Sequence, residues 1–200
     1  LSSGGLVVGN TIREQRSVNT AGILLSTGTA RNNVVTDNYV GISGGTAIVG
    51  NRVSGSTKEG IIYNYSSATQ LEQNVVFNNE TGLAVGVSAF NGPVVKNNLV
   101  YNNSLFGIRL YSSNLTLLNN TVYQPVGNAV VLESGLAGVQ LRNNVIWALA
   151  GVGITVPANS QVGFQSDYNL LFGKVGSWQG VERTTLAAWQ SAAFTDQNSI

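Results

Sequence analysis

One asparagine recurs along the whole chain, at a spacing that only a repeating fold can accommodate. Its eight positions lie 18 to 25 residues apart, with a mean of about 23: Asn10, Asn33, Asn51, Asn74, Asn98, Asn120, Asn144 and Asn169. Two residues after each of them the side chain is aliphatic in every case: Ile12, Val35, Val53, Val76, Val100, Val122, Ile146 and Leu171. Self-similarity at such a period is the signature of a repeat architecture.

A second apolar run precedes this anchor asparagine in most repeats. The runs are Gly22–Leu25, Gly60–Tyr63, Gly82–Val85, Gly107–Leu110, Ala129–Leu132 and Gly153–Val156. They are short and rich in β-branched and aliphatic residues, they are bounded by Gly, Asn and Ser, and no helical period occurs before residue 184. The pattern predicts an all-β solenoid with three short strands per coil of about 23 residues, stacked in about eight coils.

The asparagine column has a physical reason in such a stack. A side-chain amide both donates and accepts hydrogen bonds, so amides stacked at the ~4.8 Å spacing of strands can bond one another as a ladder. The segments Leu117–Val122 and Leu141–Ile146 read apolar-x-Asn-Asn-x-aliphatic. This motif resembles the right-handed parallel β-helix repeat of pectate-lyase-like proteins, and the resemblance covers residues 9–173. It implies the fold strongly and the chemistry weakly, because that solenoid carries lyases, hydrolases, epimerases and adhesins.

The last part of the chain departs from the repeat. We expect the coils to occupy residues 1–175 and a capping segment to occupy residues 176–200. Within the cap, Thr184 or Thr185 is suited to start a short helix whose residues Leu186, Trp189 and Ala193 share one face. We expect residues 186–194 to cover the exposed strand edges at that end. Because the chain begins at Leu1 and not at Met, we expect further coils upstream, and a monomer or part of a longer chain.

Composition excludes several functions. The chain has no Cys, His or Met, which excludes a Ser-His-Asp triad, a thiol nucleophile, disulfides and a zinc site of His or Cys. The only aspartates are Asp37, Asp167 and Asp196, which are too far apart for the carboxylate cluster of a polygalacturonase or a calcium site. We therefore expect no metal and no cofactor. A net charge of +1 predicts no nucleic-acid partner, and no apolar run is long enough for a membrane span.

The resemblance implies a polysaccharide groove on the run that precedes the anchor. In that run, alternation directs the residues two and four after the glycine outward. This places Arg109, Tyr111 and Glu133 within about one rung of each other, with Lys58 and Glu80 further along the same face. A uronate lyase could use an arginine beside a tyrosine: the arginine would hold the acid group, and the tyrosine would move the C5 proton. Alternatively, Glu133 only pairs with Arg109.

An aromatic column forms a second candidate. Three residues after the anchor, five consecutive repeats carry a ring: Phe77, Tyr101, Tyr123, Trp147 and Phe172. Such rings stack to stiffen a solenoid, and they also suit the flat faces of sugars. Tyr101, Tyr123 and Trp147 are therefore further substrate-binding candidates.

Two functions of different classes agree with these features. The first is a secreted or cell-surface β-helix that interacts with a polysaccharide or cell-surface glycan, one form of which is the C-terminal part of a polysaccharide lyase-like enzyme. The second is a non-catalytic structural or adhesive solenoid. Both predict an extracellular or cell-surface location, and the sequence leaves catalysis open.

Overall fold

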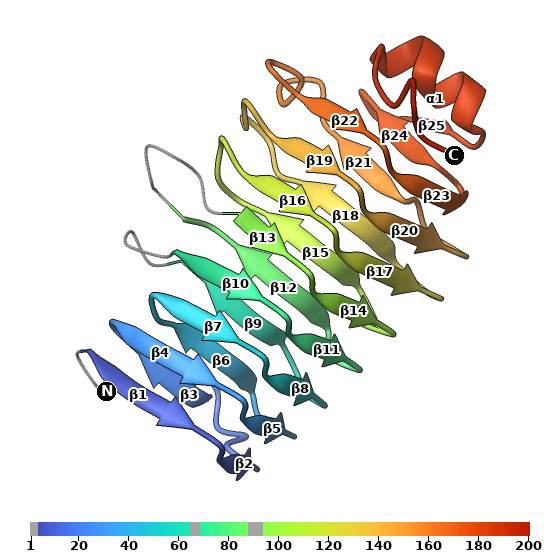
Figure 1. Cartoon of the computed structure of the whole chain (residues 1–200). Helices are drawn as coiled ribbons and strands as arrows, with labels where there is room; N and C mark the ends of the chain where they lie inside the picture. The colour runs from blue at the N-terminus through green and yellow to red at the C-terminus, as the bar shows by residue number, and fades with distance from the viewer. Residues whose placement is uncertain (1–3, 65–68, 88–93) are drawn as a thin grey trace.

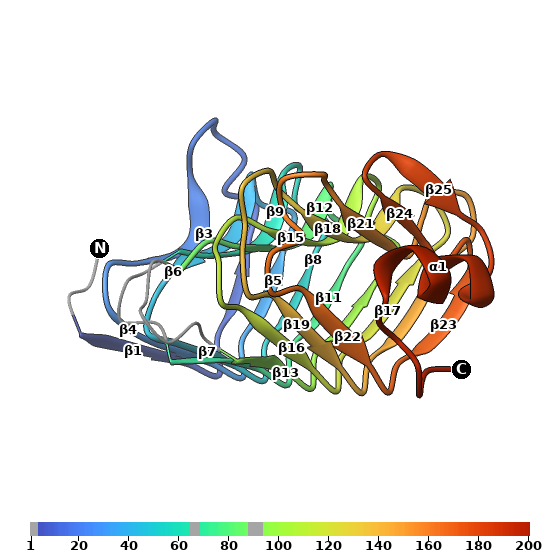
Figure 2. The same cartoon turned by 90° about the horizontal axis from the view of Figure 1, so that it is seen from above.

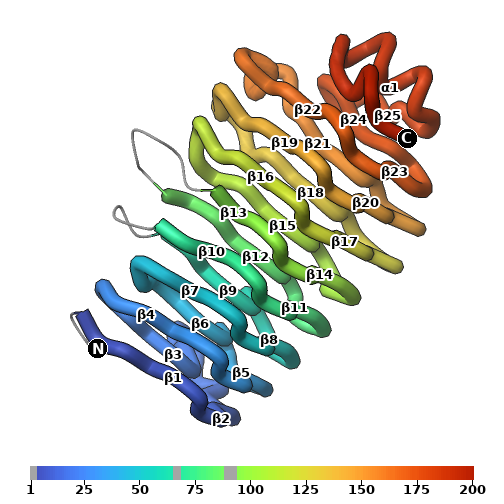
Figure 3. Tube along the Cα trace, in the orientation of Figure 1, coloured from blue at the N-terminus to red at the C-terminus, as the bar shows by residue number. Residues whose placement is uncertain are grey.

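The computed structural model shows a right-handed parallel β-helix, which confirms the predicted fold class. It describes residues 4–64, 69–87 and 94–200. The chain winds through three sheets in turn, and each coil lies directly on the one before it (Figures 1 and 3). Among the described residues, no helix combines the length and apolar character needed to cross a bilayer.

Each coil contributes one strand to each sheet. The first sheet contains β1 (Gly5–Val8), β4 (Gly28–Arg31), β7 (Ala47–Val49), β10 (Gln70–Glu72), β13 (Val94–Lys96), β16 (Thr116–Leu118), β19 (Gln140–Arg142) and β22 (Gln165–Asp167). The second contains β2 (Thr11–Arg13), β5 (Val34–Thr36), β8 (Arg52–Ser54), β11 (Val75–Phe77), β14 (Leu99–Tyr101), β17 (Thr121–Gln124), β20 (Val145–Ala148) and β23 (Leu170–Gly173). The third contains β3 (Ala21–Leu25), β6 (Val40–Gly44), β9 (Glu59–Tyr63), β12 (Thr81–Val85), β15 (Phe106–Leu110), β18 (Asn128–Leu132), β21 (Ile154–Val156) and β24 (Gly176–Trp178), then β25 (Val181–Arg183) antiparallel to β24.

The core is a set of aliphatic columns that run through the stack. In the second sheet, Val76, Val100, Val122 and Ile146 are direct register partners, and each is at most 1% exposed. These residues lie two positions after their anchor asparagines, as the sequence predicts. Figure 2 shows the molecule turned by 90° from the view of Figure 1. In this view the third sheet lies opposite the first, and the second sheet joins them.

The asparagine ladder is present and buried. From Asn33 to Asn169 every anchor is at most 2% exposed, while Asn10 in the first coil is exposed. Each anchor Nδ2 donates to the Oδ1 of the next anchor along the chain, at 2.9–3.2 Å. The backbone N–H of each anchor donates to the same oxygen. The ladder therefore satisfies amides that would otherwise be costly to bury.

The residue before each anchor explains why asparagines occur in pairs. All eight of these residues have positive φ, between 53° and 69°: Gly9, Asn32, Gly50, Gln73, Asn97, Asn119, Asn143 and Tyr168. Gly and Asn adopt this left-handed conformation most readily. In the Asn-Asn pairs, the first residue therefore makes the turn and the second makes the ladder.

A second, shorter ladder lies at the next turn, and the sequence reading missed it. The backbone N–H of Ser56 donates to Asn79 Oδ1, that of Asn79 to Asn103 Oδ1, and that of Asn103 to Gln124 Oε1. These side chains are buried. They lie four or five residues after each anchor, so a search for a second polar column at that offset would have found them.

The C-terminal helix α1 (Leu186–Ala193) forms as predicted, and Thr185 is its N-cap, with Oγ1 accepting from the Ala188 N–H at 3.2 Å. Trp189 is completely buried, and Leu186 and Ala193 pack against the core. Figure 1 shows α1 at the C-terminal end of the stack. The prediction that Phe194 helps to cover this end is wrong. Phe194 takes the left-handed conformation that ends the helix, and it is 88% exposed.

The segment after the helix terminates the ladder. Asp196 is 1% exposed, and its carboxylate accepts from Asn169 Nδ2 at 3.0 Å and from the Trp189 indole N–H at 2.7 Å. A carboxylate only accepts, so it suits a position where the amide of the last anchor needs an acceptor.

Candidate functional site

The outer surface of the third sheet brings together the first group of predicted residues. Ile108 and Leu110 of β15 point inward and are completely buried, so Arg109 and Tyr111 point outward. Backbone bonds between coils hold this edge in place: the Tyr111 N–H donates to Val85 O at 2.8 Å, and the Glu133 N–H donates to Leu110 O at 3.0 Å. The expected adjacency of Arg109, Tyr111 and Glu133 is present.

Arg109 is the centre of this cluster. Its Nε donates to Glu133 Oε1 at 2.5 Å, and both side chains are about one third exposed. The guanidinium carbon also lies 4.9 Å from the ring centroid of Tyr111 and 5.1 Å from that of Phe106, which are cation–π distances. Arg109 is thus held by a carboxylate and two rings, and much of its charge is already satisfied.

The pKa values follow from these contacts. Burial raises the pKa of the Tyr111 hydroxyl; the Arg109 charge opposes this, and the charges of Glu133 and Glu59 add to it. Partial burial acts to lower the pKa of Arg109, but the hydrogen bond to Glu133 and the charges of Tyr111, Glu133 and Glu59 together outweigh it, and the pKa is raised. At neutral pH Tyr111 is therefore a protonated hydroxyl and Arg109 a cation.

A shallow cleft of about 280 Å³ lies beside Tyr111. It is lined by Glu59, Ile62, Asn64, Ala84, Gly86 and Tyr111. Gly86 stands between the side chains of Asn64 and Tyr111, and a Cβ there would lie 3.4 Å from Tyr111 Cβ and 4.0 Å from Asn64 Cβ. The absence of a side chain at Gly86 therefore leaves the gap open.

A neighbouring cleft of about 320 Å³ extends the hollow toward the N-terminal coils. It is lined by Asn19, Thr20, Ala21, Leu24, Tyr39, Val40, Ser43, Lys58, Glu59 and Ile62. Glu59 and Ile62 line both clefts. We call the two together the third-sheet groove.

The structure places Lys58 and Glu80 at the border of this groove and pairs them with each other. Lys58 Nζ lies 2.9 Å from Glu80 Oε2, and the hydrogen bond to Glu80 is the main reason why the pKa of Lys58 is raised. Sequence reasoning did not select Glu59, Asn64, Gly86 or Tyr39. Glu59, Asn64 and Gly86 flank the apolar runs that correspond to the run of Arg109 in a later coil, so aligning the coils places them on the same face. Only the structure shows that this face is hollowed.

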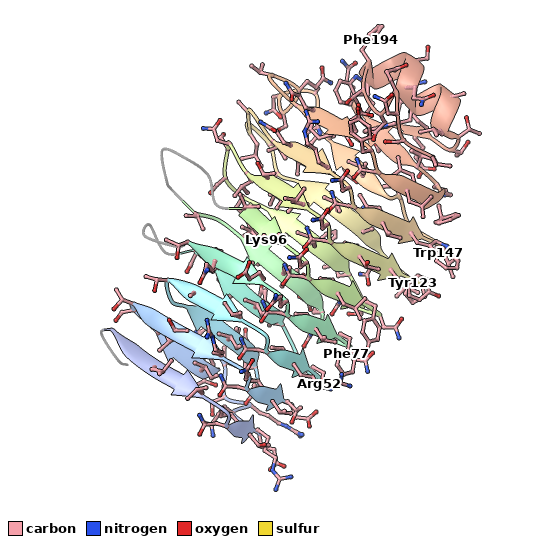
Figure 4. The ribbon with its side chains drawn as sticks, viewed as in Figure 1. Arg52, Phe77, Lys96, Tyr123, Trp147 and Phe194 are labelled. Atoms are coloured by element: carbon pink, nitrogen blue, oxygen red, sulfur yellow. The ribbon has the colours of Figure 1, made fainter. Side chains whose placement is uncertain are left out.

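The aromatic column lies on a different surface, the outside of the second sheet. Phe77 and Tyr101 stack face to face, with centroids 4.8 Å apart and planes inclined by 2°, and the Arg52 guanidinium carbon lies 4.4 Å from the centroid of Phe77. Trp147 makes tilted or edge contacts with Tyr123 at 5.0 Å and with Phe172 at 5.6 Å. Figure 4 shows Arg52, Phe77, Tyr123 and Trp147 along one side of the ribbon.

The rings at the two ends of the aromatic column differ in how open they are to a ligand. Stacking covers the ring faces that Phe77 and Tyr101 turn to each other, so those faces are not open to a sugar. Trp147 and Phe172 keep 42% and 46% of their surfaces exposed. The candidate residues of the sequence therefore form two separate sets: Arg109, Tyr111, Glu133, Lys58 and Glu80 on the third sheet, and Tyr101, Tyr123 and Trp147 on the second.

A hollow of about 580 Å³ at the N-terminal end is of another kind. It is lined by the inner side chains of β1 to β3, such as Val7, Ile12 and Ile23. These are core positions of the first coil, and three further strands of the third sheet separate β3 from β15. We therefore centre the candidate site on the third-sheet groove.

Comparisons with known proteins place the chain in a family. Neither the curated proteins nor the solved structures gave a match. One family model does match, over residues 3–173, and its description is periplasmic copper-binding protein (NosD). The matched range contains every strand of the first two sheets and every strand of the third except β24 and β25. The chain therefore belongs to the NosD family of periplasmic β-helix proteins.

Proposed function

We propose that this protein is a periplasmic or cell-surface β-helix that binds an extended polysaccharide in the third-sheet groove. The observation that carries the proposal is the cleft in which Tyr111, Asn64 and Glu59 surround a floor of Ile62, Ala84 and Gly86. An apolar floor with a few polar groups at its rim is the usual composition of a ligand site. The family description supports a location outside the cytoplasm.

The repeat itself suits a polymer. Successive strands of the third sheet are ~4.8 Å apart, and an extended glycan advances by about 5 Å per sugar, so neighbouring sugars meet neighbouring coils. Tyr111 is 43% exposed and offers a ring edge and a hydroxyl. Asn64 offers an amide that both donates and accepts. These groups match sugar hydroxyls and C–H faces without any change of the backbone.

Binding is better supported than cleavage. A tyrosine that removes a proton from a uronate needs a lowered pKa, but burial raises that of Tyr111. An arginine that holds the substrate carboxylate needs an uncompensated positive charge, but the charge of Arg109 is paired with that of Glu133. The cluster therefore favours a recognition surface over a lyase centre.

The copper named in the family description does not fit these 200 residues. The main copper ligands in proteins are His, Cys and Met, and this chain contains none of them. Within residues 4–64, 69–87 and 94–200, no group of three or more His, Cys, Asp or Glu residues is placed to hold a metal ion. We therefore assign no step to copper.

This has a direct test. Adding Cu(II), or Cu(I) under reducing conditions, should leave the midpoint of thermal unfolding unchanged, because a ligand stabilises only when it binds the native state. Differential scanning calorimetry with and without a chelator measures this. A clear copper-dependent rise in the midpoint would contradict the assignment.

The proposed site is tested by titration with oligosaccharides of several classes, measured by calorimetry. Tyr111→Ala should weaken binding about tenfold or more, because it removes the largest group at the cleft. Gly86→Leu should abolish binding by filling the gap; its backbone φ is not in the left-handed region, so the variant should fold normally. Trp147→Ala, on the second sheet, is the matched aromatic control and should bind like the parent.

The outcomes separate the alternatives. If Trp147→Ala loses binding and Tyr111→Ala does not, the aromatic column of the second sheet is the binding surface. If no oligosaccharide binds, the second candidate function remains, a structural or adhesive solenoid. The face-to-face stack of Phe77 and Tyr101, with Arg52 on Phe77, favours that role, because it stiffens the outer surface and covers the ring faces that Phe77 and Tyr101 turn to each other.

A further inference from the structure

The charges around the third-sheet groove are unequal, and this bears on the class of ligand. Four charged side chains at its border form two ion pairs: Lys58 with Glu80 at 2.9 Å, and Arg109 with Glu133 at 2.5 Å. Each pair is close to neutral for an approaching ligand. The fifth charged residue, Glu59, takes part in neither pair.

Glu59 has a central position in the groove. It opens β9, is half-buried, and lines both clefts. Within the described part of the chain its carboxylate makes no ion pair within 4.0 Å. Its charge reaches the Tyr111 cleft: burial is the main reason for the raised pKa of Tyr111, and Glu59 adds to it.

We propose that the groove recognises a polysaccharide carrying protonated amines, with Glu59 as the residue that binds the ammonium group. This inference rests on the proposed function and names its substrate class. An ammonium group has three donors and no acceptor, so the acceptors around it decide the fit. The Glu59 carboxylate and the Asn64 amide oxygen are acceptors that line one cleft beside Tyr111.

The same charges disfavour a uronate polymer, the substrate class that the arginine and tyrosine by themselves indicate. A carboxylate in the groove would meet the negative charge of Glu59. The nearby cations that could compensate are held by Glu80 and Glu133. Charge complementarity therefore points to amino sugars and against acidic ones.

The experiment compares three oligosaccharides of equal length: a fully deacetylated oligoglucosamine, its N-acetylated counterpart and an oligogalacturonate. At about pH 5.5 a carboxylate is ionised and an amine is protonated. We expect the parent protein to bind oligoglucosamine about tenfold more tightly than the N-acetylated oligomer. This preference should decrease as salt is added.

Glu59→Gln is the deciding variant, because it keeps the shape of the side chain and removes its charge. It should reduce the preference for oligoglucosamine over the N-acetylated oligomer to near unity, because the binding of oligoglucosamine is the one that depends on the charge. Glu182→Gln is the matched control: Glu182 is an exposed carboxylate paired with Lys174 at 3.2 Å in the C-terminal region, and its removal should not alter the preference.

The results distinguish this inference from the proposed function. If oligosaccharides bind and Tyr111→Ala weakens them, but Glu59→Gln leaves the preference unchanged or the uronate binds most tightly, the inference is wrong and the site stands. If the preference for amines survives Gly86→Leu and Tyr111→Ala, the groove is not the site and both proposals fail. If no oligosaccharide of any class binds the parent protein, the proposed function is wrong, and the inference that rests on it is wrong as well.

Discussion

Replacing Trp189 by alanine should lower the free energy of unfolding by about 3–5 kcal/mol, the range found for removal of a buried tryptophan. Trp189 belongs to the C-terminal helix and is completely buried, with its ring in edge contact with Trp178 at 5.8 Å and Phe164 at 6.3 Å. Its indole N–H donates to the buried Asp196 carboxylate at 2.7 Å. Alanine would leave a cavity and remove one donor from that carboxylate.

Urea unfolding followed by far-UV circular dichroism measures the effect without relying on tryptophan fluorescence. Two variants control the interpretation. Trp189→Phe keeps most of the ring and loses the hydrogen bond, so it should cost less than alanine. Trp147→Ala removes a tryptophan that is 42% exposed and should cost about 1 kcal/mol or less. Equal losses for Trp189→Ala and Trp147→Ala would show that the helix does not seal the core.

Replacing Asn120 by leucine should lower the free energy of unfolding by about 1–3 kcal/mol, although leucine has a similar size. Asn120 Oδ1 accepts from the Nδ2 and the backbone N–H of Asn98, and its Nδ2 donates to Val95 O and Asn144 Oδ1. Each buried polar group left without a partner costs about 1–3 kcal/mol. The variant affects the coils on both sides at once.

The control for Asn120 is an asparagine that is not part of the ladder. Asn159 lies in an exposed turn after β21, and Asn159→Leu should change the stability by no more than about 0.5 kcal/mol. Thermal and urea unfolding of the two variants should therefore differ clearly. A loss near zero for Asn120→Leu would mean that the ladder bonds contribute little beyond what water offers in the unfolded chain.

Much of the candidate site depends on side chains that only the folded stack brings together. Alternation along residues 107–111 was sufficient to predict that Arg109 and Tyr111 face outward, because neighbouring side chains on a strand point to opposite sides. The cleft was not predictable in this way. It exists because Gly86 lacks a side chain between Asn64 and Tyr111, residues that are 47 positions apart in the chain.

The ion pairs also divide into those that the sequence predicts and those that depend on the tertiary structure. Coil register alone indicates that Glu72 lies beside Lys96, and the pair forms at 3.0 Å. The same register places Arg142 beside Asp167, but Asp167 instead accepts from the backbone N–H and Nδ2 of Asn198, both at 2.8 Å. The C-terminal segment folds back over the first sheet there, and no repeat pattern contains that information.

The sequence by itself determined the parallel β-helix, the aliphatic columns, the buried ladder and the short capping helix. These features repeat at a fixed period or depend on neighbours within one turn, so a single chain displays the same constraint many times. The second polar ladder also repeats with the coils, so the sequence contains it as well. The tertiary structure decided the buried carboxylate of Asp196 that ends the first ladder, the exposure of Phe194 and the groove around Glu59. Each of these depends on contacts made once, between segments whose separation in the chain follows no period, and such contacts become specific only when the coils have packed.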